Sequence, residues 1–285
     1  MKVIRAQAMG LCFGVRDALA YLATIADPTS VTVYGELVHN PRVNRDLEQR
    51  GFRRTPEDGR EGAVPATETV LITAHGISDA ERARLEAAGR RLLDTTCPLV
   101  RRAHDAALQL DRQGYLVLII GRREHVEVRG LVGDLRVCEV VGSPTEVRSY
   151  GAERIGVIAQ TTTPDSLVRA VLEAARALNP GKEIRYVDTV CRPTRERQAA
   201  LGWLLPQVDA LVVVGGRNSR NTNELGEAAW ARGVRALRVE SAAELEPAWF
   251  EGCETVGLTA GTSTLDETVE QVHRALLEMP PGGAH

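Results

Sequence analysis

Short apolar runs alternate along the chain with longer segments in which apolar residues recur every three or four positions. The runs have the length of buried strands, and the longer segments have the period of amphipathic helices. Regular alternation of the two patterns is typical of α/β units built around parallel sheets. We expect strands at Val31–Tyr34, Val70–Thr73, Tyr115–Ile120, Ile155–Ile158, Ala210–Val214 and Thr255–Leu258, and an edge strand within Met1–Arg5.

A polar segment follows each of the six apolar strands, with histidine, serine, threonine or asparagine close to glycine or alanine. The segments are 35–40, 74–78, 121–127, 159–163, 215–223 and 259–264. Ligands bind beyond the carboxyl ends of parallel strands, so we expect these segments to line one central cleft. Ordinary polar loops on independent units are the alternative. The repeated combination of these residue types with glycine favours the cleft.

Three widely separated cysteines, Cys12, Cys97 and Cys191, each stand before a segment of helical periodicity. Pro98 follows Cys97, and proline is favoured at the first helical position, so we expect Cys97 at a helix N-cap. Free N–H groups and the helix dipole at such a terminus favour a thiolate over a thiol. The pattern therefore predicts three similar units, each offering one thiolate.

Three isolated thiolates favour an iron–sulfur cluster over a zinc site. Structural zinc usually takes four ligands with Cys-x-x-Cys pairs, and the sequence has no such pair. A cluster held by three cysteines keeps one iron open for chemistry. Cys138 and Cys253 lack polar motifs around them, and we expect both to pack as small hydrophobic residues.

Composition excludes several functional classes. The 285 residues carry a net charge of −3, with 44% hydrophobic and 26% charged residues. This balance is ordinary for a globular protein and gives no electrostatic reason to expect nucleic acid or an acidic membrane. No apolar stretch is long enough to span a bilayer, and the N-terminus lacks a signal-peptide core. We expect a cytoplasmic protein that acts on a small molecule, with no nucleic-acid or membrane partner.

A phosphate-bearing substrate would have to be held largely without lysine. The sequence has no P-loop motif, and lysine occurs only at Lys2 and Lys182. Histidine, hydroxyl, amide and backbone donors remain for this task. The candidates are His39, His75, Ser219, Asn221 and Ser263. A lone histidine is usually a loop or cap residue, but two of them follow comparable strands in the first unit.

Glu127 and His125 form the carboxylate–histidine pair of these polar segments. A carboxylic acid in a dry cleft can have a raised pKa and donate a proton. A surface charge cluster with the neighbouring arginines explains the pair equally well when the pair is considered alone.

These motifs together resemble the LytB family of 4-hydroxy-3-methylbut-2-enyl diphosphate reductases, which catalyse the last step of the non-mevalonate isoprenoid pathway. The matching stretches follow the family's order: 10–15, 36–40, 74–78, 94–100, 125–130, 160–162, 191–198, 218–223 and 259–263. The resemblance implies an α/β trefoil of three pseudo-equivalent domains with small parallel sheets around a central iron–sulfur cleft. The boundaries are an N-terminal strand at 1–12, domains at 13–96, 97–190 and 191–276, and a C-terminal tail at 277–285, frayed from Pro280.

The resemblance also implies a [4Fe–4S] cluster with Cys12, Cys97 and Cys191 as its ligands. The substrate hydroxyl would bind the open iron and leave as water after uptake of two electrons and two protons. The products would be isopentenyl and dimethylallyl diphosphates. Ferredoxin, flavodoxin or a reductase system would supply the electrons.

Residue roles carry over position by position. Glu127 matches the proton-delivering glutamate, and His125 and Thr161 are the other two catalytic candidates, with Thr161 in the proton network. The diphosphate contacts implied are His39, His75, His125, Ser219, Asn221 and Ser263, with Thr194 on the substrate side and Arg220 as a further candidate between two of them.

The chain also departs from the family's pattern. Val126 and Leu265 stand where the family usually has proline, Arg129 where it has glutamate, Arg220 where it has serine and Phe13 where it has alanine. A paralogue acting on another allylic diphosphate is therefore one alternative. A non-catalytic iron–sulfur sensor, which would bind no diphosphate, is a second. A quinolinate-synthase-like enzyme would need a more cationic pocket for its carboxylate substrates.

Overall fold

The computed structural model describes residues 1–279, and the contacts within it divide the chain into two compact units. Unit 1 comprises Met1–Val15, His39–Arg42 and the chain from Arg192 onward, and unit 2 comprises Arg16–Val38 and Val43–Cys191. The frayed tail expected at 280–285 lies outside the described residues. The domain boundaries expected from the sequence stay a prediction.

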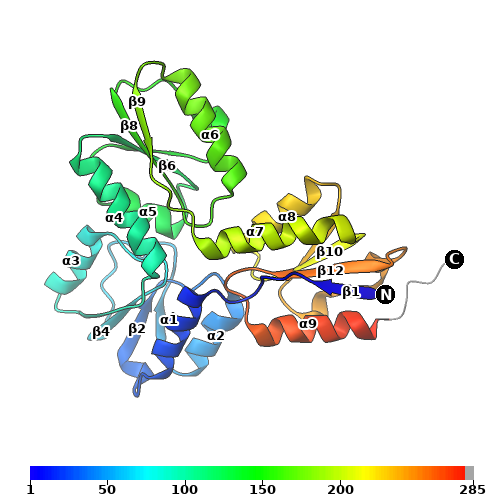
Figure 1. Cartoon of the computed structure of the whole chain (residues 1–285). Helices are drawn as coiled ribbons and strands as arrows, with labels where there is room; N and C mark the ends of the chain where they lie inside the picture. The colour runs from blue at the N-terminus through cyan, green and yellow to red at the C-terminus, as the bar shows by residue number, and fades with distance from the viewer. Residues whose placement is uncertain (280–285) are drawn as a thin grey trace. The chain divides into compact units, whose positions relative to one another are not determined.

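Unit 2 contains two parallel sheets of four strands each (Figure 1). The first has the order β3-β2-β4-β5, with β2 at Val31–Tyr34, β3 at Arg53–Thr55, β4 at Thr69–Ile72 and β5 at Arg91–Asp94. The second has the order β7-β6-β8-β9, with β6 at Leu116–Ile120, β7 at Cys138–Val141, β8 at Arg154–Ala159 and β9 at Glu183–Tyr186. The two sheets therefore repeat one topology.

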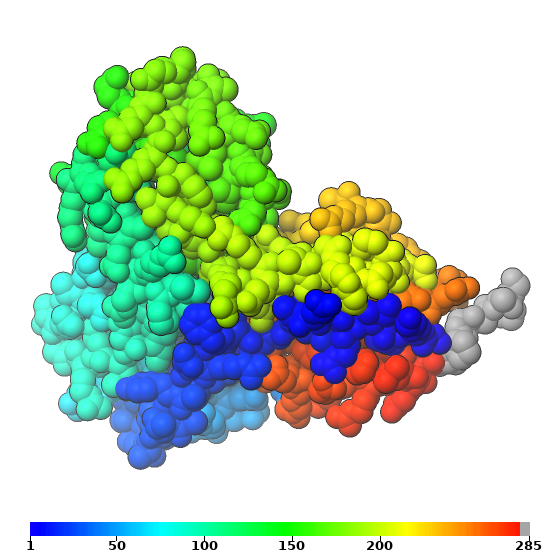
Figure 2. All heavy atoms as spheres, viewed as in Figure 1, coloured from blue at the N-terminus to red at the C-terminus, as the bar shows by residue number. Residues whose placement is uncertain are grey.

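Unit 1 contains a third parallel sheet of the same design. Its order is β11-β10-β12-β1, with β1 at Lys2–Arg5, β10 at Ala210–Val214, β11 at Arg235–Val239 and β12 at Thr255–Ala260. The first strand of the chain pairs with the last one in the register Lys2 to Thr255 through Arg5 to Leu258. Figure 2 shows this N-terminal strand at the surface of unit 1, where it completes the sheet that the C-terminal part of the chain begins.

Nine α-helices are assigned within residues 1–279. They are α1 (Phe13–Ala23), α2 (Pro41–Gln49), α3 (Asp79–Ala87), α4 (Pro98–Arg112), α5 (Val126–Val132), α6 (Asp165–Leu178), α7 (Arg192–Leu204), α8 (Arg220–Trp230) and α9 (Asp266–Glu278). Short 3-10 turns lie at Pro28–Ser30, Pro144–Glu146, Leu205–Gln207, Ala242–Glu244 and Pro247–Phe250. None of the helices in this described part of the chain is long and apolar enough to cross a membrane.

Helices cover both faces of the second and third sheets (Figure 1). In the second sheet, α6 packs on one face through residues such as Val171, while α4 and α5 pack on the other through residues such as Leu110. In the third sheet, α9 covers one face, and α7 and α8 cover the other. Burial on both faces explains why the central strands are continuous apolar runs.

The predicted fold class is confirmed, since the structure is α/β with three small parallel sheets. All six apolar runs are central strands of these sheets, with ends that shift by one or two residues from the prediction. The sequence analysis missed β3, β5, β9 and β11, which all lie at sheet edges. Edge strands face solvent, so β3, β5 and β9 consist of exposed and partly buried residues, and no long apolar run marks them.

The helix starts at the cysteines also follow the prediction. Cys97 is the N-cap residue of α4, and Pro98 is its first helical residue. Cys12 and Cys191 directly precede α1 and α7. Each cysteine also follows an edge strand, since β5, β9 and β1 are the strands before Cys97, Cys191 and Cys12.

Candidate active site

The three predicted cluster ligands share one local backbone geometry. The N–H group of each cysteine donates to a carbonyl in the polar segment that follows the neighbouring central strand. These hydrogen bonds are Cys97 to Ala74 (3.0 Å), Cys191 to Thr161 (2.9 Å) and Cys12 to Thr262 (3.0 Å). The same hydrogen bond from a cysteine N–H therefore occurs after β4, β8 and β12. Each of the three bonds lies at the end of a different sheet.

The cysteine side chains suit a cluster with thiolate ligands. None of the five cysteines, which all lie within residues 1–279, forms a disulfide, and Cys12, Cys97 and Cys191 are partly exposed, as is Cys138. Cys253, by contrast, is buried, and the guanidinium of Arg235 donates to its sulfur at 3.0 Å. Partly exposed thiols at helix starts are accessible to a metal centre, so the three predicted ligands fit the chemistry of such a group.

Glu127 is a buried glutamate of unit 2. It lies in the first turn of α5 with 3% of its surface exposed. Its Oε1 accepts from the backbone N–H of Thr161 at 2.7 Å, and its Oε2 lies 2.9 Å from the Thr161 hydroxyl. Burial raises the pKa of Glu127 to about 7, and the hydrogen bonds from Thr161 lower it only in part. The carbonyl of Thr161 accepts from Cys191, so one residue links the acid to a predicted ligand.

Two predicted substrate contacts, His75 and His125, come together in unit 2. Their rings meet edge to face with centroids 5.7 Å apart. His125 is the N-cap of α5, and its Nδ1 accepts from the N–H of Glu127 at 3.2 Å. An accepting Nδ1 carries no proton, which leaves Nε2 as the donor of the neutral ring. His75 and Glu127 line the same small cavity of unit 2.

The other predicted contacts lie in unit 1 and are joined by hydrogen bonds. Asn221 Oδ1 accepts from the N–H of Thr262 at 3.0 Å, and Thr262 also accepts from Cys12. The Ser263 hydroxyl donates to the carbonyl of His39 at 3.3 Å. Ser219 is the N-cap of α8 and accepts from the N–H of Thr222 at 3.4 Å. Ser219, Asn221 and Ser263 are all at least 95% buried.

The backbone at Gly216 lies close to the backbone at His39, one of these predicted contacts. A Cβ atom on Gly216 would lie 2.6 Å from the carbonyl oxygen of His39, so only glycine fits there. The side-chain amide of Asn40 donates to the carbonyl of Ser263 at 2.7 Å. The segments after β10 and β12 are thereby connected to His39.

Thr194 and Arg220 complete the predicted set. Thr194 is fully buried in the first turn of α7. The guanidinium of Arg220 pairs with Glu224 one helical turn later at 2.6 Å, and the side chains are 16% and 7% exposed. The charge of Arg220 is thus offset within its own helix, and its role as a substrate contact stays a prediction.

Comparison with known proteins identifies the family. A family model described as LytB protein matches residues 3–277. The chain belongs to the LytB family. A 4-hydroxy-3-methylbut-2-enyl diphosphate reductase of Aquifex aeolicus is 35% identical, with 98% of this chain and 97% of the relative covered. The enzyme of the same name from Anaeromyxobacter sp. (strain K) is 38% identical, with 95% and 97% covered.

Solved structures of LytB-type reductases have the same fold. The E-1-hydroxy-2-methyl-but-2-enyl-4-diphosphate reductase of Plasmodium falciparum aligns with a TM-score of 0.88 at 23% identity, covering 100% of this chain and 92% of that one. The (E)-4-hydroxy-3-methyl-but-2-enyl diphosphate reductase described as the terminal enzyme of the non-mevalonate pathway aligns with a TM-score of 0.66 at 33% identity, covering 98% and 100%. The predicted family and enzyme class, an oxidoreductase, are confirmed.

Two departures from the LytB pattern have clear local settings. Val126, in place of the usual proline, is 2% exposed and is the first residue of α5, so the His125 cap keeps its geometry without proline. Arg129, in place of the usual glutamate, pairs with Glu57 at 3.4 Å and with Glu61 at 3.1 Å. The His125 cap and the turn that carries Glu127 thus form with Val126 and Arg129 at these positions.

Two buried arginines were missed as site residues. Arg197 is 4% exposed and donates to the carbonyls of Pro193 (2.9 Å) and Gly10 (2.5 Å), which links the start of α7 to the loop before Cys12. Arg60 is 2% exposed and lies in a segment that looked like an ordinary charged loop. A buried arginine that binds backbone carbonyls leaves no pattern in sequence, because its partners are main-chain atoms.

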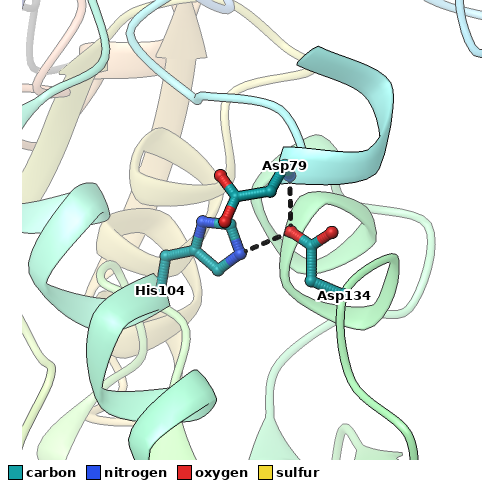
Figure 3. Close-up of side chains that lie close together, drawn as sticks. All are labelled: Asp79, His104 and Asp134. Atoms are coloured by element: carbon teal, nitrogen blue, oxygen red, sulfur yellow. Dashed lines mark hydrogen bonds and ion pairs between the residues drawn. The ribbon is translucent and has the colours of Figure 1, made fainter. Parts of the chain in front are cut away.

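A separate cluster of Asp79, His104 and Asp134 connects three helical segments of unit 2 (Figure 3). Their potential ligand atoms lie within 4.8 Å of one another. The Asp134 carboxylate, however, accepts from the N–H groups of Asp79 (2.6 Å) and Ala80 (3.0 Å), and His104 Nε2 lies 2.8 Å from it. Asp134 thus satisfies free N–H groups at the start of α3, which is a structural role.

Proposed function

We propose that this protein catalyses the reductive dehydroxylation of 4-hydroxy-3-methylbut-2-enyl diphosphate to isopentenyl and dimethylallyl diphosphates. The reaction takes up two electrons and two protons and releases water. The observation that carries the proposal is the connection from Glu127 through Thr161 to Cys191. It links a buried acid to a thiol of the kind that recurs at an equivalent position in all three sheets.

We assign Cys12, Cys97 and Cys191 as the ligands of a [4Fe–4S] cluster. Their matched backbone hydrogen bonds and their partial exposure support this assignment. When bound, such a cluster supplies electrons and an open iron that acts as a Lewis acid toward the substrate oxygen.

Glu127 would deliver the proton that the departing hydroxyl group requires. With a pKa of about 7, a substantial fraction of Glu127 is protonated at neutral pH. The Thr161 N–H holds Oε1, and the protonated Oε2 can donate to the Thr161 hydroxyl, which passes a proton onward by rotation. The cap made by His125 fixes the first turn of α5 and so aims the carboxyl group.

The diphosphate would be held by largely neutral donors. We assign this role to His39, His75, His125, Thr194, Ser219, Asn221 and Ser263, with Arg220 as an additional contact. Ser219 and Asn221 lie at the N-terminus of the 11-residue helix α8, where free N–H groups and the helix dipole favour an anion. Ferredoxin or flavodoxin as the electron donor, and the cytoplasm as the location, remain part of this proposal.

Anaerobic turnover is the direct test. Protein purified without oxygen should be brown, and after chemical reduction it should convert the hydroxylated C5 diphosphate to both products. A change in the electron paramagnetic resonance spectrum on addition of this substrate would report ligation at the open iron. Normal cluster content with turnover only of a different allylic diphosphate would replace the proposal by the paralogue. Absence of any thermal shift with diphosphates would favour the sensor.

A further inference from the structure

We propose that Arg60 is a positioning residue that fixes two strand-end segments of the site, and this inference rests on the proposed function. One segment is Gly35–Val38, which leads to His39, and the other contains His75. Arg60 lies in the loop between β3 and β4 and is 2% exposed.

The guanidinium of Arg60 binds a carbonyl in each segment. Its Nη1 donates to the carbonyl of Tyr34 at 3.0 Å, directly before Gly35. Its Nη2 donates to the carbonyl of Gly76 at 3.3 Å, directly after His75. Because β2 and β4 are neighbouring parallel strands, one planar fork reaches both of their carboxyl ends. The separation of the two segments is thereby tied to the rigid geometry of a single side chain.

Glu57 completes the connection to the first segment. Its Oε1 lies 3.5 Å from Arg60 Nε, and its Oε2 accepts from the N–H of Glu36 at 2.6 Å. Gly35 has φ +96°, and a Cβ atom there would lie 2.4 Å from Glu57 Oε2 and 2.9 Å from Arg60 Nη1. The turn into the His39 segment therefore lies against these two side chains, and its positive φ favours glycine.

Tyr34 holds the arginine in place from the other side. The Arg60 guanidinium carbon lies 5.7 Å from the centroid of the Tyr34 ring, and the Tyr34 hydroxyl is within hydrogen-bond distance of the Arg60 carbonyl. Tyr34 itself is fully buried in β2. The arginine thus has a fixed location even though its loop has no regular secondary structure.

The same loop also contacts the helix that carries the acid. Arg129, two residues after Glu127 on α5, pairs with Glu57 at 3.4 Å and with Glu61 at 3.1 Å. Arg60, Glu57 and Glu61 form a link between the β2 end, the β4 end and α5. Glu57 binds the first segment through Glu36, whereas Arg60 binds a carbonyl at each of the two segments.

Removal of the guanidinium would leave both carbonyls without this donor in a buried setting, so the two segments would loosen. Arg60→Met keeps a long apolar side chain and tests this directly. The matched control is Arg84→Met. Arg84 lines the same cavity of about 300 Å³ as Arg60, but it donates to the carbonyl of Ala63, to Glu81 and to the Tyr34 hydroxyl, and these partners lie outside both segments.

The experiment uses the anaerobic holoenzyme with the hydroxylated C5 diphosphate as substrate. Arg60→Met should raise KM about tenfold, because loosening of both segments weakens their contacts to the diphosphate, with kcat within about twofold of wild type and unchanged iron content. Amide exchange should accelerate in 35–38 and 74–78. Arg60→Lys, which keeps the charge but not the fork, should recover part of the change, and Arg84→Met should match wild type in KM and in exchange of both segments.

Wild-type KM and exchange in Arg60→Met would overturn the inference, as would equal effects in Arg84→Met. If Arg60→Met fails to fold, Arg60→Lys decides: a raised KM supports the positioning role and a wild-type KM refutes it. If wild-type protein does not turn over the substrate, the proposed function fails. The exchange comparison between the two arginine variants then still tests whether Arg60 fixes the segments.

Discussion

Two buried glutamates, one in each unit, have opposite electrostatic settings. Glu127 in unit 2 is 3% exposed, and within residues 1–279 it pairs with neither arginine nor lysine, since its partners are the amide and hydroxyl of Thr161. Glu224 in unit 1 is 8% exposed and is ion-paired with Arg220 at 2.6 Å. A buried carboxyl group without a cation is pushed toward its neutral form, while one beside a cation is held in its charged form.

The different surroundings of the two glutamates suit the two units to different roles, proton delivery in unit 2 and anion binding in unit 1. The set in unit 2 combines an acid of raised pKa with two imidazoles and is suited to proton delivery. The set in unit 1 consists mostly of hydroxyl and amide groups at a helix N-terminus and is suited to anion binding. Substitution of Glu127 should therefore act mainly on kcat and its pH dependence, and substitutions of the hydroxyl and amide residues in unit 1 mainly on KM.

Loss of a proposed cluster ligand should have the largest effect, because it removes the group that we propose supplies electrons to the reaction. Cys12→Ser, Cys97→Ser or Cys191→Ser should lower kcat/KM by at least about a thousandfold, with loss of iron and of the brown colour. Iron and sulfide analysis together with anaerobic assays measure this. Cys138→Ser is the control and should keep both. Full iron content in any of the three ligand variants would contradict the assignment.

Replacement of each glutamate by glutamine should show most clearly that Glu127 and Glu224 have different roles. Glu127→Gln should lower kcat by about a hundredfold to a thousandfold, with little change in KM, because a general acid acts in the chemical step. Glu224→Gln should instead raise KM, since it leaves Arg220 without its partner, and should keep kcat. Steady-state kinetics of both variants decide this. Glu124→Gln, an exposed change in the same segment as Glu127, should behave as wild type.

The pH dependence of stability should identify Glu127 as the neutral acid. Its pKa is about 7 in the folded protein and 4.5 in the unfolded one, so between these values the folded state binds more protons. Its stabilising contribution is complete below pH 4.5 and is lost as the pH rises through 7, by about 3 kcal/mol. Denaturant titrations of the holoenzyme at pH 5 and pH 8 should show this decrease in wild type and not in Glu127→Gln. An equal decrease in both would refute the raised pKa.

The smallest effect is expected from a single hydroxyl group in unit 1. Ser263→Ala removes the donor to the His39 carbonyl and a proposed contact to the diphosphate. We expect KM to rise about fivefold, which is the contribution of one neutral hydrogen bond, while kcat and the pH profile stay unchanged. Ser241→Ala, at an exposed turn, is the matched control for kinetic assays. A fall in kcat with unchanged KM would assign Ser263 to the proton-delivery set instead.

Much of the fold could be read from local sequence patterns. The six central strands were identifiable because they are buried on both faces and need continuous apolar runs. The helix start at Cys97 was identifiable from Pro98, whose fixed φ suits the first helical position. Polar residues that can donate protons or bind an anion follow these strands in sequence, and this position made them candidates for the site.

Other features depend on partners that are distant in sequence. The pairing of β1 with β12 joins the two ends of the chain, and no local pattern specifies it. The edge strands β3, β5, β9 and β11 gain their conformation from a neighbouring strand and not from their own apolar content. Arg60 and Arg197 became visible only through the carbonyls that they bind.

The sequence by itself determined which residues are available for chemistry: three cysteines before helices, and a glutamate beside a histidine cap. The tertiary structure decided how Glu127 behaves, because its pKa depends on the exclusion of water and on the absence of a cationic partner in the part of the chain described. Desolvation is a property of the packed surroundings of a side chain, and the order of residues along the chain does not contain it.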